Sequence, residues 1–477
     1  MNLAQHVLGQ PHPGRIALIC GDEQVGREEL ALRVARAAGA LRALGVKPGE
    51  QVLFVMRDTP QFAAAWLGAV HAGAIAVALN SKLSEADYRH ILADSGAKVA
   101  LVDEPFAAAR AAFGKICTSL PAGGGAPPPF DAEPDAPALC LYSSGTTGRP
   151  KGILHAHRAA LSIGEAFRAL GIAAGDRVFT TSKFFFAYGL EHALLAPLAM
   201  GVTSILSADW PDAETVAAIV GRHRPRAMFS VPTIYRRLLA EPRERLAAFR
   251  EVRHFVAGGE RLSPQLVEQW RAGAGGELLN LYGMSEGFCA CMMTPPGTSD
   301  GLRTGMPFPI TEVRLVAPGP GEPGVLWLRH PAQARGYVNL PQESQAQFRD
   351  GWFCSRDLFV RDAQGFYVHQ GRSDELVKVA GQWVWPAELE EAALSDAAVT
   401  EAACVPVPDA EGLHRLALFV TGKQSAASAA YAACEGLPRH KRPKWVRAVA
   451  ELPRTGTGKV QRYKLREILE RELRAKG

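Results

Sequence analysis

The segment from 143 to 152 carries the residue types that most clearly suggest chemistry. It runs Ser-Ser-Gly-Thr-Thr-Gly-Arg-Pro-Lys-Gly, directly after the apolar stretch 138–142. Glycines let backbone N–H groups approach an anion, hydroxyls add hydrogen-bond donors, and a lysine adds a mobile positive charge. The pattern predicts a polyphosphate-binding loop, although its spacing differs from that of the Walker loop. The candidate phosphate contacts are Ser143, Ser144, Gly145, Thr146, Thr147, Gly148 and Lys151.

A second segment, Asn-Leu-Tyr-Gly-Met-Ser-Glu at 280–286, combines an aromatic ring, a hydroxyl and a carboxylate. The ring of Tyr282 can stack on an adenine base. Ser285 and Glu286 can address a phosphate and a hard cation, because Mg²⁺ is usually held by one or two carboxylates together with substrate phosphates. The segment therefore predicts a nucleotide site in which Glu286 is the metal ligand, although alone it would be an ordinary turn.

Together with three later segments, these two resemble the adenylate-forming superfamily of acyl-CoA synthetases, peptide-synthetase adenylation domains and luciferases. The later segments lie at 351–357, 371–390 and 453–462. Each motif is ambiguous alone, but five in the family's order are specific. Within the superfamily, Phe-Phe-Ala-Tyr-Gly-Leu at 185–190 and Gly-Arg-Ser-Asp at 371–374 are most similar to benzoate-CoA ligases and their aryl relatives.

The resemblance implies that Asp357 binds the ribose hydroxyls of ATP, since a carboxylate offers two acceptor oxygens to a vicinal diol. Arg372 would reach the ribose or a phosphate. The family usually has Thr-Gly before this aspartate, and the chain has Ser355 and Arg356 instead. The remaining residues implied to contact ATP or AMP are Gly258, Gly259, Glu260, Asn280, Tyr282 and Gly283.

The resemblance also implies a moving catalytic lysine. Lys459, in the Gly-rich segment 453–462, would stabilise charge that builds on the α-phosphoryl oxygens during transfer, and Ser285 and Glu286 would share the catalytic site. Asp374 matches the hinge position about which the small domain of this family rotates. Such a hinge would let one chain present different groups to two successive steps.

The acid and the thiol have candidate residues as well. Aromatic residues at 184–188 would by default be core, but the family lines its acyl pocket there, and a flat aromatic acid would suit it. The implied acid-pocket residues are Phe186, Ala187, Tyr188, Gly189, Gly258 and Met284. The implied CoA-binding residues are Lys378, Gly381, Trp383 and Lys441.

The predicted function is an ATP-dependent acid–thiol ligase that uses Mg²⁺, adenylates a carboxylic acid and transfers the acyl group to coenzyme A. Between 439 and 476 the chain has thirteen lysines and arginines but four acidic residues. This basic segment suits the phosphates of CoA, but it would also suit an acidic carrier protein with a phosphopantetheine arm. A nucleotide-binding regulator without activity is the rival class, and the presence of Glu286, Asp357 and Lys459 argues against it.

The expected fold class is α/β. Helix-like segments at 28–44 and 62–72 alternate with strand-like ones at 51–56, 74–79 and 98–102. We predict a large N-terminal domain of doubly wound sheets plus a β-rich subdomain, followed by a small mobile α+β C-terminal domain. The predicted boundaries are 1–371 for the first domain, 372–375 for the hinge and 376–477 for the lid.

Composition excludes several other classes. The 477 residues are 47% hydrophobic and 21% charged, and the net charge of +5 is weak for a nucleic-acid binder. No apolar stretch approaches the roughly 18–20 residues of a membrane span, and the first residues lack an export pattern. The eight cysteines are scattered. We expect a cytoplasmic monomer or homodimer with no membrane or nucleic-acid partner.

Overall fold

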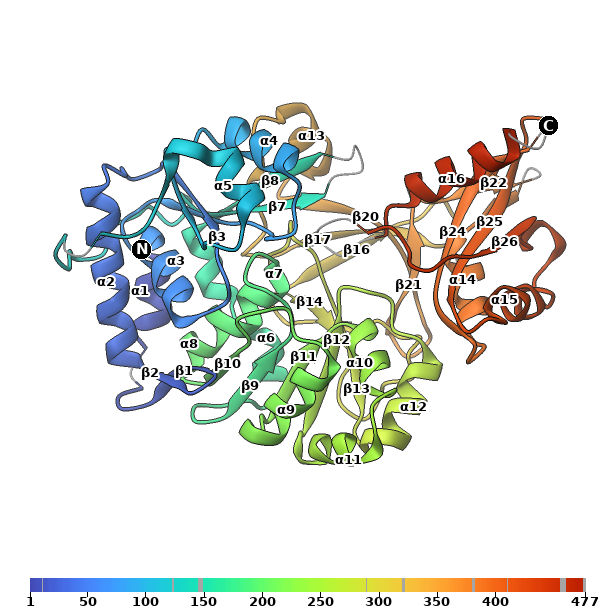
Figure 1. Ribbon diagram of the computed structural model, residues 1–477, viewed down its shortest axis with the longest axis horizontal. Coiled ribbons are helices and arrows are strands. Elements are labelled where there is room, and N and C mark those ends of the chain that lie inside the picture. Colours follow the sequence, from blue (N-terminus) through green and yellow to red (C-terminus); the bar gives the residue numbers. More distant parts are fainter. Residues whose placement is uncertain are drawn as a thin grey trace. The chain divides into compact units, whose positions relative to one another are not determined.

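The structure is a computed structural model that describes residues 1–10, 12–121, 124–144, 149–288, 290–319, 322–379, 382–409, 411–454 and 460–474 (Figure 1). The chain divides into two compact units. The first comprises residues 1–314, 327–355 and 361–368, and the second comprises 315–326, 356–360 and 369–477. The boundary predicted at 371 and the hinge at 372–375 stay predictions.

Over the described ranges, the first unit contains a seven-stranded sheet in the order β18-β8-β7-β4-β3-β5-β6. Strands β4, β3 and β5 run parallel to their neighbours, while β7 and β8 form an antiparallel pair. The bounds are β3 (Gln51–Val55), β4 (Ile75–Ala78), β5 (Val99–Val102), β6 (Cys117–Thr118), β7 (Pro137–Ser144), β8 (Pro150–Ala156) and β18 (Gly336–Tyr337).

A second sheet of this unit has nine strands within the described residues, in the order β15-β14-β13-β12-β11-β9-β10-β1-β2. The run from β13 to β1 is parallel, and both edges are antiparallel. The bounds are β1 (Ile16–Cys20), β2 (Glu23–Gly26), β9 (Arg177–Thr180), β10 (Thr203–Leu206), β11 (Ala227–Ser230), β12 (His254–Gly258), β13 (Leu278–Gly283), β14 (Ala290–Met293) and β15 (Met306–Pro307).

Helices cover these sheets because their apolar faces need burial. Helices α2 and α3 pack closely at Gly68, where a Cβ atom would lie 2.6 Å from the Cβ of Ala37. Helix α4 begins with a capping box between Ser84 and Asp87. The helices of the first unit are α1 (Leu3–Leu8), α2 (Arg27–Ala43), α3 (Pro60–His71), α4 (Glu85–Ser95), α5 (Ala107–Phe113), α6 (Glu165–Ala169), α7 (Ala187–Gly189), α8 (Ala196–Met200), α9 (Ala213–His223), α10 (Pro232–Leu238), α11 (Arg243–Leu246), α12 (Pro264–Ala274) and α13 (Pro341–Gln347).

A further sheet has the order β16-β17-β20-β19, with β21 paired to β20, and its longer strands supply residues to both units. Segment 351–357 mostly belongs to one ten-residue strand, β20. The bounds are β16 (Glu312–Val316), β17 (Gly324–Arg329), β19 (Phe348–Arg349), β20 (Trp352–Arg361) and β21 (Tyr367–Arg372).

The second unit continues with an α+β arrangement. Strands β22 and β23 form a hairpin, and β24, β25 and β26 form a separate sheet whose faces pack against helices. The bounds are β22 (Val377–Val379), β23 (Gln382–Val384), α14 (Pro386–Leu394), β24 (Val399–Pro408), β25 (His414–Gly422), α15 (Ala426–Cys434), β26 (Trp445–Ala448) and α16 (Arg462–Arg474). The predicted α/β class, with a large first part and a small α+β second part, is confirmed.

In the part of the chain that the structure describes, the helices are all too short or too polar to cross a membrane.

The N-terminal helix is held by a buried histidine. His157 follows β8 directly, is 1% exposed, and accepts the backbone N–H of Leu3 at its Nδ1 atom, 3.1 Å away. Burial, with the nearby N-terminal ammonium, lowers the pKa of His157 to about 4 from its ordinary value of 6.5. Protonation at Nδ1 would remove the acceptor, so the neutral ring is the form that the fold requires.

We predict that this histidine makes the free energy of unfolding depend on pH. Because its folded pKa lies below its unfolded value, the contribution is fully present above pH 6.5 and is lost as pH falls towards about 4. His157→Asn keeps an acceptor for Leu3 but does not titrate. The Tm of thermal unfolding should therefore fall less steeply between pH 7 and pH 4.5 for this variant than for the wild type. His414→Asn, at an exposed position, is the control and should keep the wild-type slope; equal slopes for all three proteins would contradict the assignment.

Candidate active site

The two ends of the predicted phosphate loop are brought together by an antiparallel pair of strands. In the register of β7 and β8, Ser143 lies opposite Lys151, and Ser144 lies opposite Pro150. The loop between them therefore starts and ends at neighbouring positions. The predicted contacts Gly145, Thr146, Thr147 and Gly148 lie outside the described residues, as does the side chain of Ser144.

Lys151 is already paired with a carboxylate. Its ammonium forms an ion pair with Glu343 of α13, and both side chains are largely buried. A phosphate that binds Lys151 must therefore compete with Glu343, which sequence reasoning did not identify. The two residues are 192 positions apart, and no local signal in the sequence joins them.

Glu286 lies in a hydrogen-bonded cluster that comes from three segments. Its Oε1 atom accepts the phenolic hydroxyl of Tyr337 at 3.0 Å, and the same hydroxyl lies 3.0 Å from Oε1 of Gln347. The backbone carbonyl of Glu286 accepts the N–H of Ala334 at 2.8 Å. These bonds fix both the backbone and the carboxylate, which fits a residue that has to present one oxygen in a constant direction.

The backbone of Ser285 is tied to β8 by a buried histidine. The Nε2 atom of His155 lies 2.8 Å from the carbonyl oxygen of Ser285, and its Nδ1 atom lies 3.0 Å from that of Ala332. Burial lowers the pKa of His155 to about 4, although both carbonyls favour the protonated ring. The neutral ring can donate to one carbonyl at a time. His155 thus has a structural role between β8 and the two backbone carbonyls. In the described ranges, no cluster of three or more potential metal ligands is present.

The other predicted residues of segment 280–286 are held by their neighbours. Tyr282 and Met284 pack against a small cluster formed by Cys291, Leu328 and Phe353. Asn280 donates from its side-chain amide to the carbonyl of Arg303 at 3.3 Å. Gly283 ends strand β13. The segment is therefore anchored along its length.

Tyr188 and Gly258 meet although seventy residues separate them. A Cβ atom at Gly258 would lie 3.3 Å from the ring of Tyr188 and 3.1 Å from the carbonyl oxygen of Leu281. The hydroxyl of Tyr188 donates towards the carbonyl oxygens of Ser230 and Val256, each 3.3 Å away. Burial raises the pKa of Tyr188 far above its ordinary value, so the phenol stays neutral. Glycine at 258 is what allows the ring to lie this close to β12.

The neighbouring glycine and acid form a fixed corner after β12. Gly259 has a φ of +80°, which favours glycine. Glu260 accepts the backbone N–H of Thr233 at 3.0 Å and its hydroxyl at 2.6 Å. Glu260 therefore connects the end of β12 to the start of α10.

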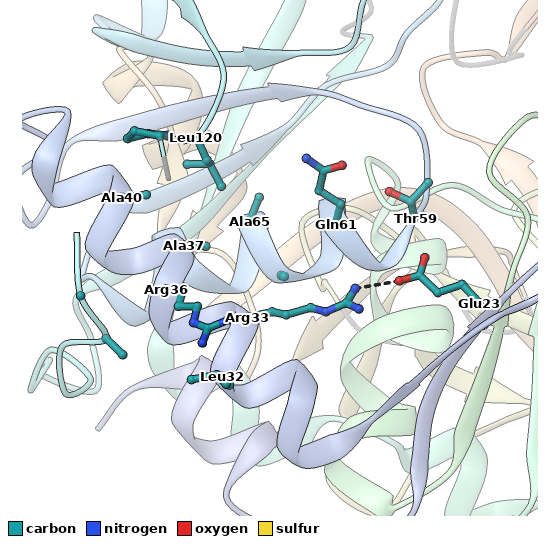
Figure 2. Close-up of a pocket in the computed structure, with 14 residues that line it drawn as sticks. Glu23, Leu32, Arg33, Arg36, Ala37, Ala40, Thr59, Gln61, Ala65 and Leu120 are labelled. Atoms are coloured by element: carbon teal, nitrogen blue, oxygen red, sulfur yellow. Dashed lines mark hydrogen bonds and ion pairs between the residues drawn. The ribbon is translucent and has the colours of Figure 1, made fainter. Parts of the chain in front are cut away.

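Elsewhere in the first unit, a surface hollow of about 890 Å³ lies between α2, α3 and the residues Leu120, Pro121, Gly125 and Ala126 (Figure 2). Its floor includes Ala37, Ala40 and Ala65, and Arg33 on one side pairs with Glu23. The described residues that line this hollow include none of the predicted site residues. This hollow therefore lies apart from the motifs.

In the second unit, three predicted residues form one charged network. Arg372 holds Asp374 through two hydrogen bonds, of 2.9 Å from Nε and 3.0 Å from Nη2. The Nη1 atom of Arg372 and Nε2 of His369 each lie 3.5 Å from Oδ1 of Asp357. Burial alone would raise the pKa of Asp374, but Arg372 holds it below its ordinary value. The predicted ribose ligand and the predicted hinge are thus linked by one guanidinium.

Arg356 has a backbone conformation that glycine usually adopts. Its φ is +62°, and its carbonyl accepts the N–H of Ser373 at 2.8 Å and the hydroxyl of Ser373 at 2.9 Å. A non-glycine residue in this region costs about 1 kcal/mol or more. The Nη1 atom of Arg356 lies 3.6 Å from Asp374. The departure from the family's Thr-Gly is therefore accommodated by a strained residue, with the strand geometry retained.

The predicted CoA residues fall on two sites of the second unit. Lys378 and Trp383 lie opposite each other in the β22–β23 hairpin, with the ammonium 5.8 Å from the exposed indole ring. Lys441 forms an ion pair of 2.6 Å with Glu388. Gly381 lies outside the described residues.

The catalytic lysine predicted at 459 also lies outside the described residues. Its flanks are described: Arg454 and Val460 form an antiparallel bridge, and Gln461 donates its N–H to the carbonyl of Pro453 at 2.7 Å. Arg462, the first residue of α16, pairs with Glu390 at 2.6 Å. The described residues on the two sides of Lys459 are therefore hydrogen-bonded to each other.

Fold and motifs together define the class: an enzyme of the adenylate-forming type with a large α/β part and a small α+β part. Two family models match this chain. The model of the AMP-binding enzyme covers residues 5–338, and that of the AMP-binding enzyme C-terminal domain covers residues 388–459. The chain belongs to the AMP-binding enzyme family.

Similar proteins match nearly the full length of this chain. A 3-hydroxybenzoate–CoA ligase of Aromatoleum sp. strain CIB is 38% identical, over 98% of this chain and 97% of its own. A solved benzoate CoA ligase from Burkholderia xenovorans LB400 is 33% identical, with a TM-score of 0.88 over 98% of this chain and 100% of its own. An anthranilate CoA ligase solved with anthranoyl-AMP is 28% identical, with a TM-score of 0.89 over 99% of this chain and 98% of its own.

We predict that Arg356→Gly raises thermal stability. Glycine removes the left-handed strain, and the partly exposed ion pair with Asp374 that it also removes contributes little. The expected gain is about 1 kcal/mol, which would appear as a rise in Tm. Arg361→Gly, at the end of the same strand and with no positive φ, should lower Tm instead. Calorimetry of both variants checks this, and a lower Tm for Arg356→Gly would contradict the strain argument.

Proposed function

We propose that the protein is an ATP-dependent ligase that joins an aromatic carboxylic acid to coenzyme A and releases AMP and pyrophosphate. The observation that carries the proposal is full-length similarity to enzymes named as CoA ligases of benzoate and 3-hydroxybenzoate. The order of the five sequence motifs supports the same conclusion, because each supplies a different part of one adenylation site.

In the first step, a carboxylate oxygen of the acid attacks the α-phosphorus of ATP, and the bond from that phosphorus to the pyrophosphate oxygen breaks. The products are an acyl-AMP mixed anhydride and pyrophosphate. Negative charge increases on the α-phosphoryl oxygens and on the leaving group, so fixed cations near them accelerate the step. Lys459 and Lys151 are the lysines that the motifs place there. Lys151 must first exchange Glu343 for phosphate.

In the second step, the thiolate of CoA attacks the acyl carbon, AMP leaves with the electrons of the broken C–O bond, and the thiol proton is released to solvent. Adenylation makes this possible because free carboxylate would have to expel oxide. Acyl-AMP hydrolyses if water reaches it, which favours an enclosed site. The charged network of Arg372, Asp374 and Asp357 would then link nucleotide binding to the hinge.

Mg²⁺ would lower the negative charge of the ATP phosphates when bound. Glu286 fits the role of its protein ligand, since a single carboxylate fixed by Tyr337 matches the way Mg²⁺ shares its sites with substrate phosphates. In the part of the chain that the structure describes, no cluster of three or more potential ligands is present, so phosphate and water would supply the rest.

The aromatic acid would lie beside Tyr188 and Gly258. A neutral phenol and a backbone without a side chain form a flat, mostly apolar wall, and a flat ring is the shape that fits it. Phe186, Ala187, Gly189 and Met284 are the further candidates for this wall. A single ring substituent changes preference by only about 1–3 kcal/mol, so the class of acid is proposed here rather than one compound.

Coenzyme A is favoured as the thiol over a carrier protein, since the similar proteins are named as CoA ligases. Lys378, Trp383 and Lys441 would bind its nucleotide portion. We further propose that the enzyme works in the cytoplasm as a monomer or homodimer. Six cysteines of the described ranges, namely Cys20, Cys117, Cys140, Cys354, Cys404 and Cys434, are free thiols, which suits a reducing compartment.

The acid specificity is tested by measuring pyrophosphate release with ATP, Mg²⁺ and a set of aryl, alicyclic and aliphatic acids. Benzoate and hydroxybenzoates should give kcat/KM values at least about tenfold above those of a long-chain fatty acid, because the proposed wall suits a flat ring. Product analysis should show AMP and an aryl-CoA thioester. A fatty acid as the best substrate would contradict the pocket, and no AMP with any acid would contradict the function.

We predict that Lys459→Ala separates the two half-reactions. Adenylation should fall by about 10²–10³-fold, the usual effect of removing one group that stabilises developing charge. Thioester formation from synthetic acyl-AMP and CoA should stay near the wild-type rate. Lys464→Ala, at an exposed position of α16, is the matched control and should leave both steps unchanged. Equal loss of both half-reactions would refute the role of Lys459.

A further inference from the structure

We propose that Lys183 is a positioning residue for the acid pocket, because its buried ammonium holds the turn 207–209 and thereby keeps Trp210 against Phe185 and Phe186. The inference rests on the proposed function, since Phe186 belongs to the proposed wall of that pocket. It adds a residue that lies outside the motifs of the nucleotide site.

The ammonium of Lys183 is saturated by backbone oxygens. The residue is 4% exposed, and its Nζ atom donates to the carbonyls of Ser207, Ala208 and Asp209 at 2.5, 3.2 and 2.6 Å. An ammonium has three hydrogens, so these three acceptors use all of them. The carboxyl group of Asp58 lies 4.0 Å away, and burial raises its pKa to about 7.

This arrangement fixes the turn strongly. A buried charge is tolerated only when it is paired and hydrogen-bonded. If the segment 207–209 moved away, the ammonium would lose its three hydrogen-bond acceptors and remain buried. The turn therefore cannot move without exposing Lys183 or leaving its charge unsatisfied.

Asp58 joins a third segment to the same point. Its Oδ2 atom accepts the N–H of Phe184 at 3.1 Å, and its own N–H donates to the carbonyl of Ala208 at 3.2 Å. Three parts of the chain that are distant in sequence are thus connected around one ammonium: the residues before α3, the segment before α7 and the turn after β10.

The connection to the pocket runs through Trp210, the next residue after the turn. Its ring lies 5.7 Å from that of Phe185 and 6.4 Å from that of Phe186, measured between centroids. The ammonium of Lys82 lies 4.2 Å from the centroid of the same indole. With the turn fixed, the indole supports the two phenylalanine rings from outside.

The backbone of Lys183 contacts both ends of helix α7. Its carbonyl accepts the N–H of Phe186 at 3.0 Å, and a Cβ atom at Gly189 would lie 2.1 Å from that carbonyl oxygen. The segment that carries Phe186, Ala187 and Tyr188 therefore rests directly on Lys183. The side chain of Lys183 thus fixes the turn next to Trp210, and its backbone fixes the segment that carries Phe186.

The experiment compares Lys183→Met, which keeps the length of the side chain and removes the charge, with the wild type. The KM for the best aromatic acid should rise about tenfold, while the KM for ATP and the kcat at saturating acid stay within about twofold. The ratio of kcat/KM for 2-naphthoate to that for benzoate should also rise, because a loosened wall admits a larger ring.

A second measurement follows Trp210 without any substrate. Acrylamide quenching is measured for the wild type and for Lys183→Met, each alongside its Trp210→Phe counterpart, and the difference isolates Trp210 from the other tryptophans. Lys183→Met should make Trp210 more accessible to the quencher. This measurement tests the clamp even if the protein uses no aromatic acid, in which case the proposed function fails on its own.

Two further variants make the result specific. Asp58→Asn should raise the KM for the acid less than Lys183→Met does, because three carbonyls still hold the ammonium. Lys98→Met, at a surface lysine paired with Glu50, should change nothing. If Lys183→Met does not fold, Lys183→Arg and Trp210→Leu replace it. Lys183→Arg should keep part of the affinity for the acid. Trp210→Leu should raise the KM for the acid and leave the KM for ATP unchanged. Unchanged KM and quenching, or an equal rise in the KM values of acid and ATP, would overturn the proposal.

Discussion

The buried contacts of the neutral His155 ring with the carbonyls of Ser285 and Ala332, to one of which it donates at a time, are the constraint on which the proposed nucleotide site depends. They connect the strand after the predicted phosphate loop to the segment that carries Glu286. Loops at the ends of strands are mobile unless their backbone groups are satisfied. One imidazole thus fixes two motifs relative to each other, although 130 residues separate them.

A similar arrangement occurs beside the proposed acid pocket, where the buried polar group is a cation. Lys183 holds three carbonyls of the turn 207–209, and Asp58 holds the segment before α7. In both places a buried polar group binds the backbone of a loop, and an aromatic or acidic side chain next to it is positioned as a result. Rigid strands supply the framework, and these few polar contacts decide where the functional loops lie.

Several charged candidates have protein partners that ligands would replace. Lys151 pairs with Glu343, Lys441 with Glu388, and Arg372 with Asp374. Such pairs neutralise charges that would otherwise repel one another or remain unsatisfied. Binding of ATP or CoA to these proposed ligands would therefore be an exchange of partners, with a net affinity set by the difference between two sets of ion pairs.

The sequence by itself determined the α/β class, the order of the motifs and the family, because these depend on local patterns: glycine and hydroxyl spacing, strand-like apolar runs, and caps such as Ser84. It also indicated that Arg356 departs from the family's glycine, but the left-handed φ of +62° came only from the structure. The pairs Lys151–Glu343 and Lys183–Asp209 were decided by tertiary structure alone, whereas the resemblance already implied one pocket for Tyr188 and Gly258. Contacts between distant residues leave no spacing in one sequence, since the fold that brings them together is set by the burial of the whole core.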